Sequence, residues 1–204
     1  YYGYSIEKLK SMNISQINIL SKQQIKTTIE KVKTGQENYF QHKHKLSDGS
    51  IRDVEIYSSP IEFKNKKFLH SIIHDITDKK IVEKELQKLS LAIEHNPVIV
   101  IITDIEGNIE YVNPKFTEVT GYPFEEVKGK NPRLLNSGNQ SKEYFEKLWD
   151  TIHSGNVWNG EFHNKKKNGK LFWESAIISP IKDKDGIVTH FVAVKEDITE
   201  KKKM

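Results

Sequence analysis

The sequence contains no cysteine among its 204 residues. This absence excludes disulfide bridges, thiolate metal sites, iron–sulfur clusters and any covalent adduct between a cysteine and a cofactor. Long apolar runs are also missing, since the longest one, 98–102, is far shorter than the roughly 20 residues that a membrane-spanning helix needs. No signal peptide is visible. We therefore expect no membrane insertion of this segment and a cytoplasmic location.

A large excess of one charge is missing as well. The chain has 32 Lys and Arg residues against 28 Asp and Glu residues, and its net charge is +4. The lysine runs 165–167 and 201–203 fall in predicted turn and linker positions. No basic helix face alternates with aromatic residues, as binding of single-stranded nucleic acid requires. We therefore expect no nucleic-acid partner.

The sequence also lacks the motifs of common enzyme classes. It has no P-loop, no His-Glu-x-x-His motif, no nucleophile elbow and no phosphoacceptor histidine motif. His163 and His190 fall on predicted strands without a pattern of orienting carboxylates. We therefore predict no catalytic residues, no metal site and no enzymatic activity in this chain.

What the sequence does contain is a long internal repeat. The repeated motifs are, in order, Gly3-Tyr4 and Gly121-Tyr122, Gly49 and Gly169, Ser59-Pro60 and Ser179-Pro180, and Asp75-Ile76-Thr77 and Asp197-Ile198-Thr199. Their offsets are 118, 120, 120 and 122, so the period is nearly constant and small loop insertions account for the rest. A period of this length predicts tandem domains of about 100 residues each.

The first copy begins late in the repeat. Tyr1 aligns with Val119, so counterparts of the residues from about Pro97 onward are absent, and the first residue is Tyr rather than Met. We therefore expect a fragment of a longer protein whose output function lies outside this sequence. The predicted parts are a first domain at 1–77 that lacks its N-terminal strands, a linker helix at 78–95, a complete second domain at 96–199 and the start of an outgoing helix at 200–204.

The second copy predicts an α+β domain. A hairpin signal at Glu106-Gly107-Asn108 separates two β-rich runs, and an apolar stripe with spacing i, i+3, i+4, i+7 marks one longer helix. In chain order we predict strands at 98–102 and 109–112, short helices near 116–119, after Pro123 and after Asn131, a longer helix between Ser141 and Gly155, and strands at 157–164, 171–181 and 187–196. This order predicts a five-stranded antiparallel sheet with the helices on one face.

These residues resemble the PAS sensor family. The resemblance rests on the Gly-Tyr-x-x-Glu turn and helix, the Asp-Gly or Asn-Gly hairpin, the Ser-Pro strand ending and the Asp-Ile-Thr motif, each of which occurs in both copies. It covers nearly the whole chain and implies two PAS-like domains, each with a five-stranded antiparallel sheet and short helices on one face, joined by an amphipathic helix. It also implies the sensory input region of a signal-transduction protein. Such tandems usually precede a histidine kinase, a diguanylate cyclase or a transcriptional activator in the same polypeptide.

The segment between the copies predicts an amphipathic helix. It has no Gly or Pro, and Val82, Leu86, Leu89 and Ile93 are spaced 4, 3 and 4 residues apart, as in a heptad seam. Two interpretations stay open, namely packing of this helix on its own sheet and pairing with a second copy. Because PAS domains usually pass signals through such helices in dimers, the resemblance favours a homodimer.

The two copies differ where a pocket would lie. Alternation along the closing strands places Glu174 and Lys195 on the helix-covered side, and the loop 183–186 predicts that they stand directly opposite each other. The first copy has Val54 and Ile73 at these positions. A buried carboxylate and ammonium destabilise the fold unless they are paired or bind something polar. Reversed faces, with a cross-strand pair on the surface, are the alternative.

The second copy further resembles the flavin-binding PAS domains. The light-oxygen-voltage photoreceptors carry Asn-Cys-Arg-Phe-Leu-Gln where this chain has 131–136, and Pro132 replaces the reactive cysteine, which excludes adduct photochemistry. The pattern of the flavin redox sensors of nitrogen fixation is closer, although Glu174 and Lys195 depart from the photoreceptor residues. The resemblance implies FAD or FMN as cofactor and the binding residues Asn131, Arg133, Asn136, Trp158, Asn164, Glu174 and Lys195.

Three alternatives to flavin stay open. The second copy could bind an unidentified small metabolite, or it could bind haem through His153 near the end of the longer helix. Alternatively, both pockets are filled and the chain is a dimerisation and relay module without a cofactor.

The repeated Asp-Ile-Thr motif lies where a strand must end and a helix begin. Asp and Thr side chains there can cap the first free amides of the helix. We therefore predict signal relay through Asp75, Thr77, Asp197 and Thr199.

Overall fold

A computed structural model describes residues 1–204, and the chain divides into two compact units, Tyr1–Gln87 (unit 1) and Lys88–Met204 (unit 2). Unit 1 holds a three-stranded antiparallel sheet in the order β1-β2-β3. Its elements are α1 (Ile6–Ser11), a 3₁₀ turn η1 (Ile14–Gln16), α2 (Lys22–Lys33), β1 (Tyr39–Lys45), β2 (Ile51–Phe63) and β3 (Lys66–Asp75), followed by α3 (Thr77–Glu94).

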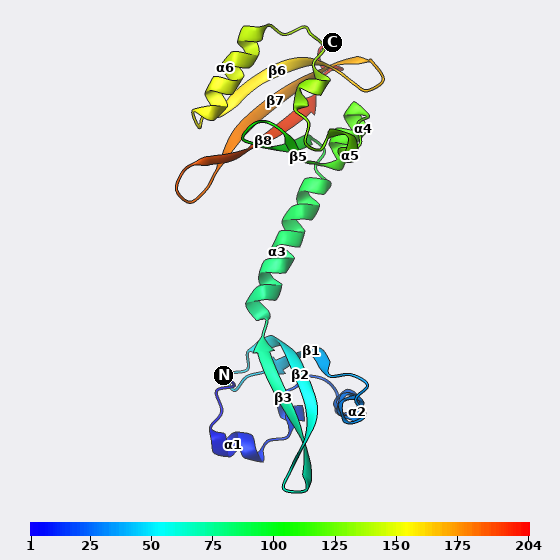
Figure 1. The fold of residues 1–204 in the computed structure, drawn as a ribbon, viewed down its shortest axis with the longest axis vertical. Coiled ribbons are helices and arrows are strands. Elements are labelled where there is room, and N and C mark those ends of the chain that lie inside the picture. Colours follow the sequence, from blue (N-terminus) through cyan, green and yellow to red (C-terminus); the bar gives the residue numbers. More distant parts are fainter. The chain divides into compact units, whose positions relative to one another are not determined.

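Unit 2 holds a five-stranded antiparallel sheet in the order β5-β4-β8-β7-β6 (Figure 1). The elements are β4 (Ile99–Asp104), β5 (Ile109–Val112), α4 (Pro114–Thr120), α5 (Phe124–Val127), η2 (Pro132–Leu135), α6 (Lys142–His153), β6 (Trp158–Lys165), β7 (Leu171–Lys182) and β8 (Val188–Asp197). The predicted order of elements is therefore confirmed for this copy. Ser141 caps α6 by accepting a hydrogen bond from the Tyr144 amide, and Gly155 follows the helix with φ of 80°.

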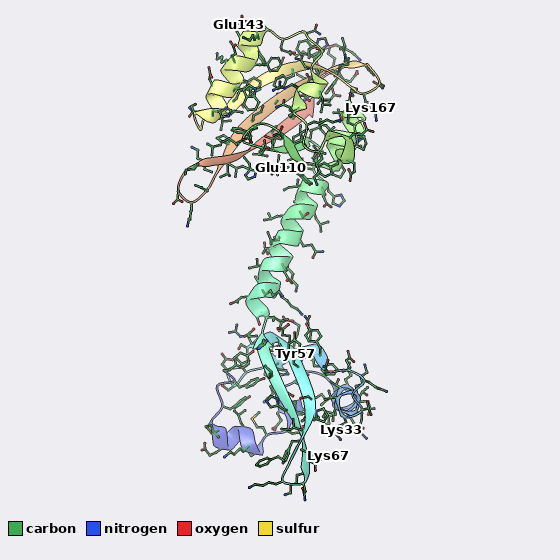
Figure 2. The ribbon with its side chains drawn as sticks, viewed as in Figure 1. Lys33, Tyr57, Lys67, Glu110, Glu143 and Lys167 are labelled. Atoms are coloured by element: carbon green, nitrogen blue, oxygen red, sulfur yellow. The ribbon has the colours of Figure 1, made fainter.

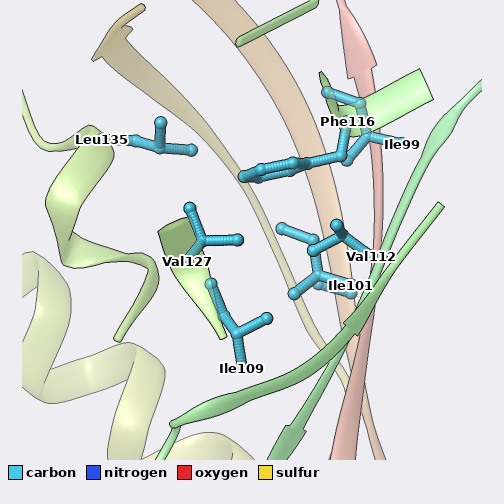
Figure 3. Close-up of a cluster of buried hydrophobic side chains, with 8 residues drawn as sticks. Ile99, Ile101, Ile109, Val112, Phe116, Val127 and Leu135 are labelled. Carbon is cyan, nitrogen blue, oxygen red and sulfur yellow. The ribbon is translucent and has the colours of Figure 1, made fainter. Parts of the chain in front are cut away.

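The core of unit 2 lies between the sheet and its helices. One cluster joins β4 and β5 to the short helices, and Figure 3 shows its aliphatic side chains surrounding Phe116 (Ile99, Ile101, Ile109, Val112, Val127 and Leu135). A second cluster lies under α6 and is rich in aromatic rings, with Leu148, Ile152, Trp158, Phe162, Ala176 and Phe191 buried together. Burial of these apolar side chains stabilises the sheet–helix arrangement. The two clusters leave a space between them.

The prediction of five strands in each sheet is wrong for unit 1. Its sheet has three strands, which are the counterparts of β6, β7 and β8. Because the repeat offset aligns Tyr1 with Val119, residues 1–77 contain no counterparts of β4 and β5. The α+β class and the antiparallel pairing are nevertheless present in both units.

The predicted register of β7 and β8 is also wrong. Glu174 stands opposite Asp197, and Lys195 stands opposite Ala176, so the true register is shifted by two residues. Lys182 pairs with Val188 and not with Ile187, which shifts the register by one residue, and an irregularity between Ile181 and Lys182 adds the second. Counting from a regular four-residue loop captures neither. Alternate residues still share a face after a shift of two, and Glu174 and Lys195 are both buried as predicted.

Helix α3 carries exposed apolar side chains. Val82, Leu86 and Leu89 are 57%, 61% and 58% exposed, and no residue of α3 is buried. Figure 2 shows side chains projecting from α3 along its length. Within its own unit none of them packs on the sheet, so the interpretation that the helix packs on its own sheet is wrong. No helix of the structure is long and apolar enough to cross a membrane.

Candidate functional site

Unit 2 encloses a cavity of about 340 Å³ between α6, the η2 segment and the inner face of the sheet. This volume falls within the range of small-molecule binding sites. Its walls are mainly apolar, and the lining residues from α6 are Phe145, Leu148, Trp149 and Ile152. The sheet contributes Ile101, Thr103, Phe162, Asn164, Ile178, Phe191, Ala193 and Lys195. The cavity is therefore an apolar slot with polar groups at selected places.

The sheet side of the cavity carries a hydrogen-bonded polar cluster. Lys195 lines the cavity and forms an ion pair with Oε1 of Glu174, and the Asn164 amide donates to the same oxygen at 2.9 Å. All three residues are buried, with Glu174 0% exposed. Glu174 Oε2 has no hydrogen-bond partner. Lys195 Nζ also lies 4.9 Å from the centre of the Phe162 ring, which places the cation beside an aromatic wall.

The η2 segment supplies the polar groups of another wall. The Asn131 side chain accepts a hydrogen bond from the Arg133 amide at 3.1 Å, which caps η2, and both residues line the cavity. Asn136 also lines it and forms an isolated β-bridge with Asn164. Gly107, with φ of 84°, lets the side chains of Trp149 and Asn131 lie close to its backbone. A Cβ there would lie 2.5 Å from the Trp149 ring and 2.8 Å from Nδ2 of Asn131.

The structure brings together most of the residues predicted to bind a cofactor. Five of the seven line the cavity, namely Asn131, Arg133, Asn136, Asn164 and Lys195. Glu174 lies behind Lys195 and Asn164 and contacts both. Trp158 does not line the cavity and packs instead against Tyr144 and Phe162. Gly160 leaves room for this ring, since a Cβ there would overlap with Trp158.

Sequence reasoning missed several cavity residues. The apolar stripe of α6 was recognised as a helix face, but the spacing alone does not distinguish a face that fills a core from one that lines a cavity. Thr103 is a buried polar residue that follows the apolar run of β4, and this position is the signal available for it. Gly107 was interpreted as a turn residue only. His153 lies outside the lining, where its ring packs on Trp149 and Phe191, so the structure offers no support for its role as a haem ligand.

The lining fits a planar heteroaromatic group. Aliphatic and aromatic side chains from α6 and from the sheet provide surfaces for a ring, and the ammonium and amide groups of Lys195, Asn164 and Asn131 offer hydrogen bonds to a polar edge. A flavin ring system has both properties that these walls select, namely apolar faces and a polar edge.

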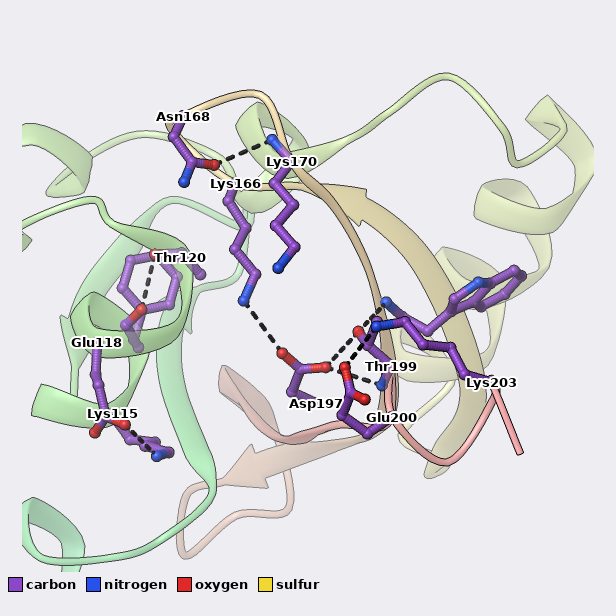
Figure 4. A network of polar contacts seen from close by, with 12 residues as sticks. Lys115, Glu118, Thr120, Lys166, Asn168, Lys170, Asp197, Thr199, Glu200 and Lys203 are labelled. Atoms are coloured by element: carbon purple, nitrogen blue, oxygen red, sulfur yellow. Dashed lines mark hydrogen bonds and ion pairs between the residues drawn. The ribbon is translucent and has the colours of Figure 1, made fainter.

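The Asp-Ile-Thr motif of unit 2 ties the end of β8 to β7. The Asp197 carboxylate accepts a hydrogen bond from the Thr199 amide at 2.9 Å, and the Trp173 amide donates to the Thr199 hydroxyl at 2.9 Å. Lys166 forms an ion pair with Asp197 at 3.2 Å (Figure 4). Burial would raise the pKa of Asp197, but the hydrogen bonds from Thr199 and the Lys166 cation outweigh it and lower the pKa. Residues 199–203 form a turn.

Unit 1 builds the same connection at the start of α3. The Asp75 carboxylate accepts from the Thr77 amide at 2.9 Å, and the Asp53 amide donates to the Thr77 hydroxyl at 2.9 Å. The predicted capping by the aspartate is therefore present, whereas the threonine bonds back to the neighbouring strand. Asp53 occupies the position of Trp173 and forms ion pairs with Lys43 and Lys80.

The interior of unit 1 differs from that of unit 2. His44 occupies the position of Asn164, is fully buried and shares a hydrogen bond of 2.8 Å with the Tyr2 hydroxyl. Burial, together with the neighbouring His42, lowers the pKa of His44 to about 4. Val54 occupies the position of Glu174 and is also fully buried. This unit therefore lacks the Glu–Lys pair of unit 2.

Comparison with known protein families identifies the family of this chain. The model of a family described as "PAS domain" matches residues 1–78 and 97–200, most of the chain. The chain belongs to the PAS domain family. Both units carry the family match, and the absence of cysteine places this PAS chain outside those that form cysteinyl adducts.

Similar proteins include regulators from bacteria and archaea. The PAS chain is 32% identical over 107 residues to a nitrogen fixation regulatory protein of Klebsiella oxytoca, which is 52% of this chain and 22% of the relative. It is 33% identical over 132 residues to the bacterioopsin transcriptional activator of Halobacterium salinarum, which is 63% of this chain and 19% of the relative. The matched region thus spans about a fifth of each relative's length.

A solved structure supports the fold alone. The PAS domain of a protein from Colwellia psychrerythraea matches with a TM-score of 0.53 at 20% identity, over 57% of this chain and 98% of that chain.

Proposed function

We propose that this chain is the sensory input region of a signal-transduction protein, in which unit 2 binds a flavin, FAD or FMN, and has no catalytic role. The cavity of about 340 Å³ with its buried Asn164–Glu174–Lys195 cluster carries this proposal. An ordinary core would fill such a space with apolar side chains and would not bury a carboxylate and an ammonium beside it. The resemblance of 131–136 and of Asn164 to flavin-binding PAS domains supports flavin over other ligands of similar shape.

The ring system of the flavin would occupy the apolar slot. We propose that the α6 side chains and Phe162 cover its faces, while Lys195, Asn164 and Asn131 bind its polar edge. Arg133 is an exposed cation in the wall of the cavity and is suited to the phosphate of an FMN or FAD tail. A flavin supplies redox chemistry when it is bound, and the protein's own residues hold and orient it.

The signal would leave through the end of β8. Lys195 lies two residues before Asp197 on this strand, and Glu174 stands opposite Asp197 in the ladder. A change at the polar edge of the ligand therefore acts close to the Asp197–Thr199 connection. We propose that it biases the orientation of the segment that follows, as a population shift between two arrangements.

In the protein that contains this chain, Asp197→Ala should uncouple output without loss of flavin, and normal signalling in that variant would contradict the relay.

The binding experiment uses the whole chain. It is purified after supplementation with FMN, FAD and riboflavin in turn, and the visible absorbance of bound flavin is measured after removal of free ligand. The matched variant is Ala193→Phe, which fills the cavity without removing a polar group. We expect retained flavin in the wild type and at least a tenfold weaker binding in Ala193→Phe.

A control variant places the same bulk in unit 1. Ser71 is the counterpart of Ala193, so Ser71→Phe should leave flavin binding unchanged. Tryptophan fluorescence during thermal unfolding checks that Ala193→Phe is folded, since all three tryptophans lie in unit 2. If the wild type retains none of the three flavins, the flavin proposal is wrong.

A second function has its own observation. The exposed apolar seam of α3, with Val82, Leu86 and Leu89, supports pairing of this helix with its counterpart in a second copy. We propose a homodimer through these linker helices and an effector domain in the same polypeptide. Without a bound cofactor, the chain would be a PAS dimerisation and relay module. Flavin binding in the experiment above distinguishes the two functions.

A further inference from the structure

Glu174 and Lys195 form a buried ion pair that is only partly satisfied. Both Lys195 Nζ and Asn164 Nδ2 contact Oε1 of Glu174, and Oε2 has no partner although the residue is 0% exposed. A buried charge is tolerated when its counter-ion and hydrogen bonds satisfy it, and removing them is strongly unfavourable. The free oxygen therefore marks an atom that can accept a proton.

The fold does not need this pair. Unit 1 has Val54 at the position of Glu174 and Ile73 at the position of Lys195, and it keeps the same ladder. Val54 stands opposite Asp75 as Glu174 stands opposite Asp197, and Ile56 stands opposite Ile73 as Ala176 stands opposite Lys195. Apolar replacement of a buried ion pair is often neutral or stabilising. The pair in unit 2 therefore serves a purpose other than stability.

The two members of the pair differ in their access to the cavity. Lys195 lines it, whereas Glu174 lies behind Lys195 and Asn164. The ammonium can thus exchange its carboxylate partner for a negatively charged edge of a ligand, and the carboxylate cannot reach that ligand itself. Lys166 is already paired, because it binds Asp197 at 3.2 Å. The other cation in the cavity wall, Arg133, is exposed to solvent. Lys195 is therefore the buried cation that can bind the ligand.

We propose that Lys195 and Glu174 act as an exchangeable counter-ion pair, in which Lys195 binds the ligand once its inner edge becomes negative and Glu174 then takes up a proton. This inference rests on the proposed binding of flavin. An external reductant supplies two electrons, one proton from solvent forms an N–H bond on the ring, and a second forms an O–H bond on Glu174 Oε2. The ring gains one negative charge and Glu174 loses one, so the net charge of the buried site is unchanged. This neutrality is favoured because an uncompensated buried charge is strongly destabilising.

The exchange also has a path to the strand end. Trp173, which precedes Glu174, accepts a hydrogen bond from the Ile198 amide at 2.8 Å and donates to the Thr199 hydroxyl at 2.9 Å. Loss of the Lys195 contact from Glu174 therefore acts on the residue next to the anchor of the outgoing segment.

The test counts protons. The flavin-loaded whole chain is titrated with dithionite at a series of pH values, and the slope of the midpoint potential against pH gives the protons taken up per two electrons. We expect two protons in the wild type and one in Glu174→Gln. Infrared difference spectra should show a protonated carboxyl band that forms on reduction in the wild type and is absent in Glu174→Gln.

A second variant separates folding from function. Glu174→Val combined with Lys195→Ile reproduces the residues of unit 1, and it should take up one proton per two electrons. Without the ammonium, the ratio of the affinity for reduced flavin to the affinity for oxidised flavin should fall at least tenfold. This change lowers the midpoint potential by about 30 mV for a two-electron couple.

The outcomes separate this inference from the proposed function. If no flavin binds to the wild type, both the flavin proposal and the counter-ion exchange are wrong. If flavin binds but the wild type takes up one proton, or both variants still take up two, the counter-ion exchange alone is overturned.

Discussion

The backbone amide of Trp173 donates a hydrogen bond to the hydroxyl of Thr199 at 2.9 Å, and the equivalent amide of Asp53 donates to Thr77 at the same distance. In each unit the threonine lies just after the last strand and the amide belongs to the strand beside it. The bond therefore fastens the outgoing segment to a second strand of the sheet. The same hydrogen bond occurs in both units although the donor is the amide of a tryptophan in one and of an aspartate in the other. The contact therefore depends on the backbone amide and not on the side chain of that residue.

Removal of the Thr199 hydroxyl should loosen this connection. Thr199→Val leaves the part-buried Trp173 amide without an acceptor, which should lower the free energy of unfolding of unit 2 by about 1–3 kcal/mol. Thr199→Ser keeps the hydroxyl and is the matched control. Urea unfolding followed by tryptophan fluorescence measures the change, and equal stability of the valine and serine variants would refute the role of the hydroxyl.

The contribution of Asp197 should depend on pH in a defined direction. Its pKa in the folded protein lies below the ordinary value of 3.8 because the bonds from Thr199 and Lys166 outweigh its burial. A depressed pKa means that the carboxylate stabilises the fold above pH 3.8 and that this contribution is lost as pH falls through the folded value. The difference in unfolding free energy between wild type and Asp197→Asn should therefore be constant near neutral pH and shrink below pH 3.8. A difference that grows on acidification would contradict this assignment.

The buried ion pair predicts a non-additive response to mutation. Lys195→Ile alone leaves Glu174 buried without a counter-ion and should destabilise unit 2 by about 3–5 kcal/mol. Adding Glu174→Val should recover all of this loss, because unit 1 tolerates the same apolar residues. Urea unfolding of the single and double variants without ligand measures the coupling. Additive losses from the two substitutions would show that the pair makes no net interaction.

Much of the fold of unit 2 could be predicted because its local signals agree with one another. Ser141 and Gly155 bracket an apolar stripe, and the turn at Glu106–Asn108 separates two β-rich runs, so periodicity and capping indicate the same elements. The register of β7 and β8 could not be predicted, because an irregularity between Ile181 and Lys182 interrupts the regular ladder that counting from the loop assumes. Which α6 residues line a cavity depends on the distance between helix and sheet, and periodicity does not report that distance.

The residues of the candidate site could likewise be predicted only in part. Comparison of the two copies identified Glu174 and Lys195, because a charged pair replaced an apolar one at positions that face inward. The resemblance to flavin-binding PAS domains implies that Trp158 binds the ligand, and alternation places it on the same strand face as Asn164. In the structure its ring packs against Tyr144 and does not line the cavity, and Gly160 leaves room for it. Side-chain orientation of this kind follows from tertiary packing and not from alternation along the strand.

His44 should make the stability of unit 1 fall on mild acidification. Its pKa in the folded unit is about 4 because of burial, well below the ordinary value of 6.5. Between these values the unfolded chain binds a proton that the folded unit does not, so stability falls by up to about 1.4 kcal/mol per pH unit as pH decreases. His44→Asn, which installs the residue of unit 2, should remove this part of the slope. Far-ultraviolet circular dichroism follows the unfolding of both units, and tryptophan fluorescence identifies the transition of unit 2, so that the remaining transition belongs to unit 1. An unchanged slope in His44→Asn would contradict the prediction.

The exposed seam of α3 predicts concentration-dependent dimerisation. Leu86 is 61% exposed on a helix with no buried residue, and a second copy of the same seam would remove this apolar surface from water. Leu86→Glu places a charge in the seam, where two copies would bring like charges together, and should weaken dimerisation at least tenfold. Gln87→Glu adds the same charge one residue further along, outside the 4-3-4 seam, and is the control. Sedimentation equilibrium measures both variants. A wild type that stays monomeric at high concentration would show that α3 does not pair, and equal weakening by the two variants would assign the effect to net charge instead of to the seam.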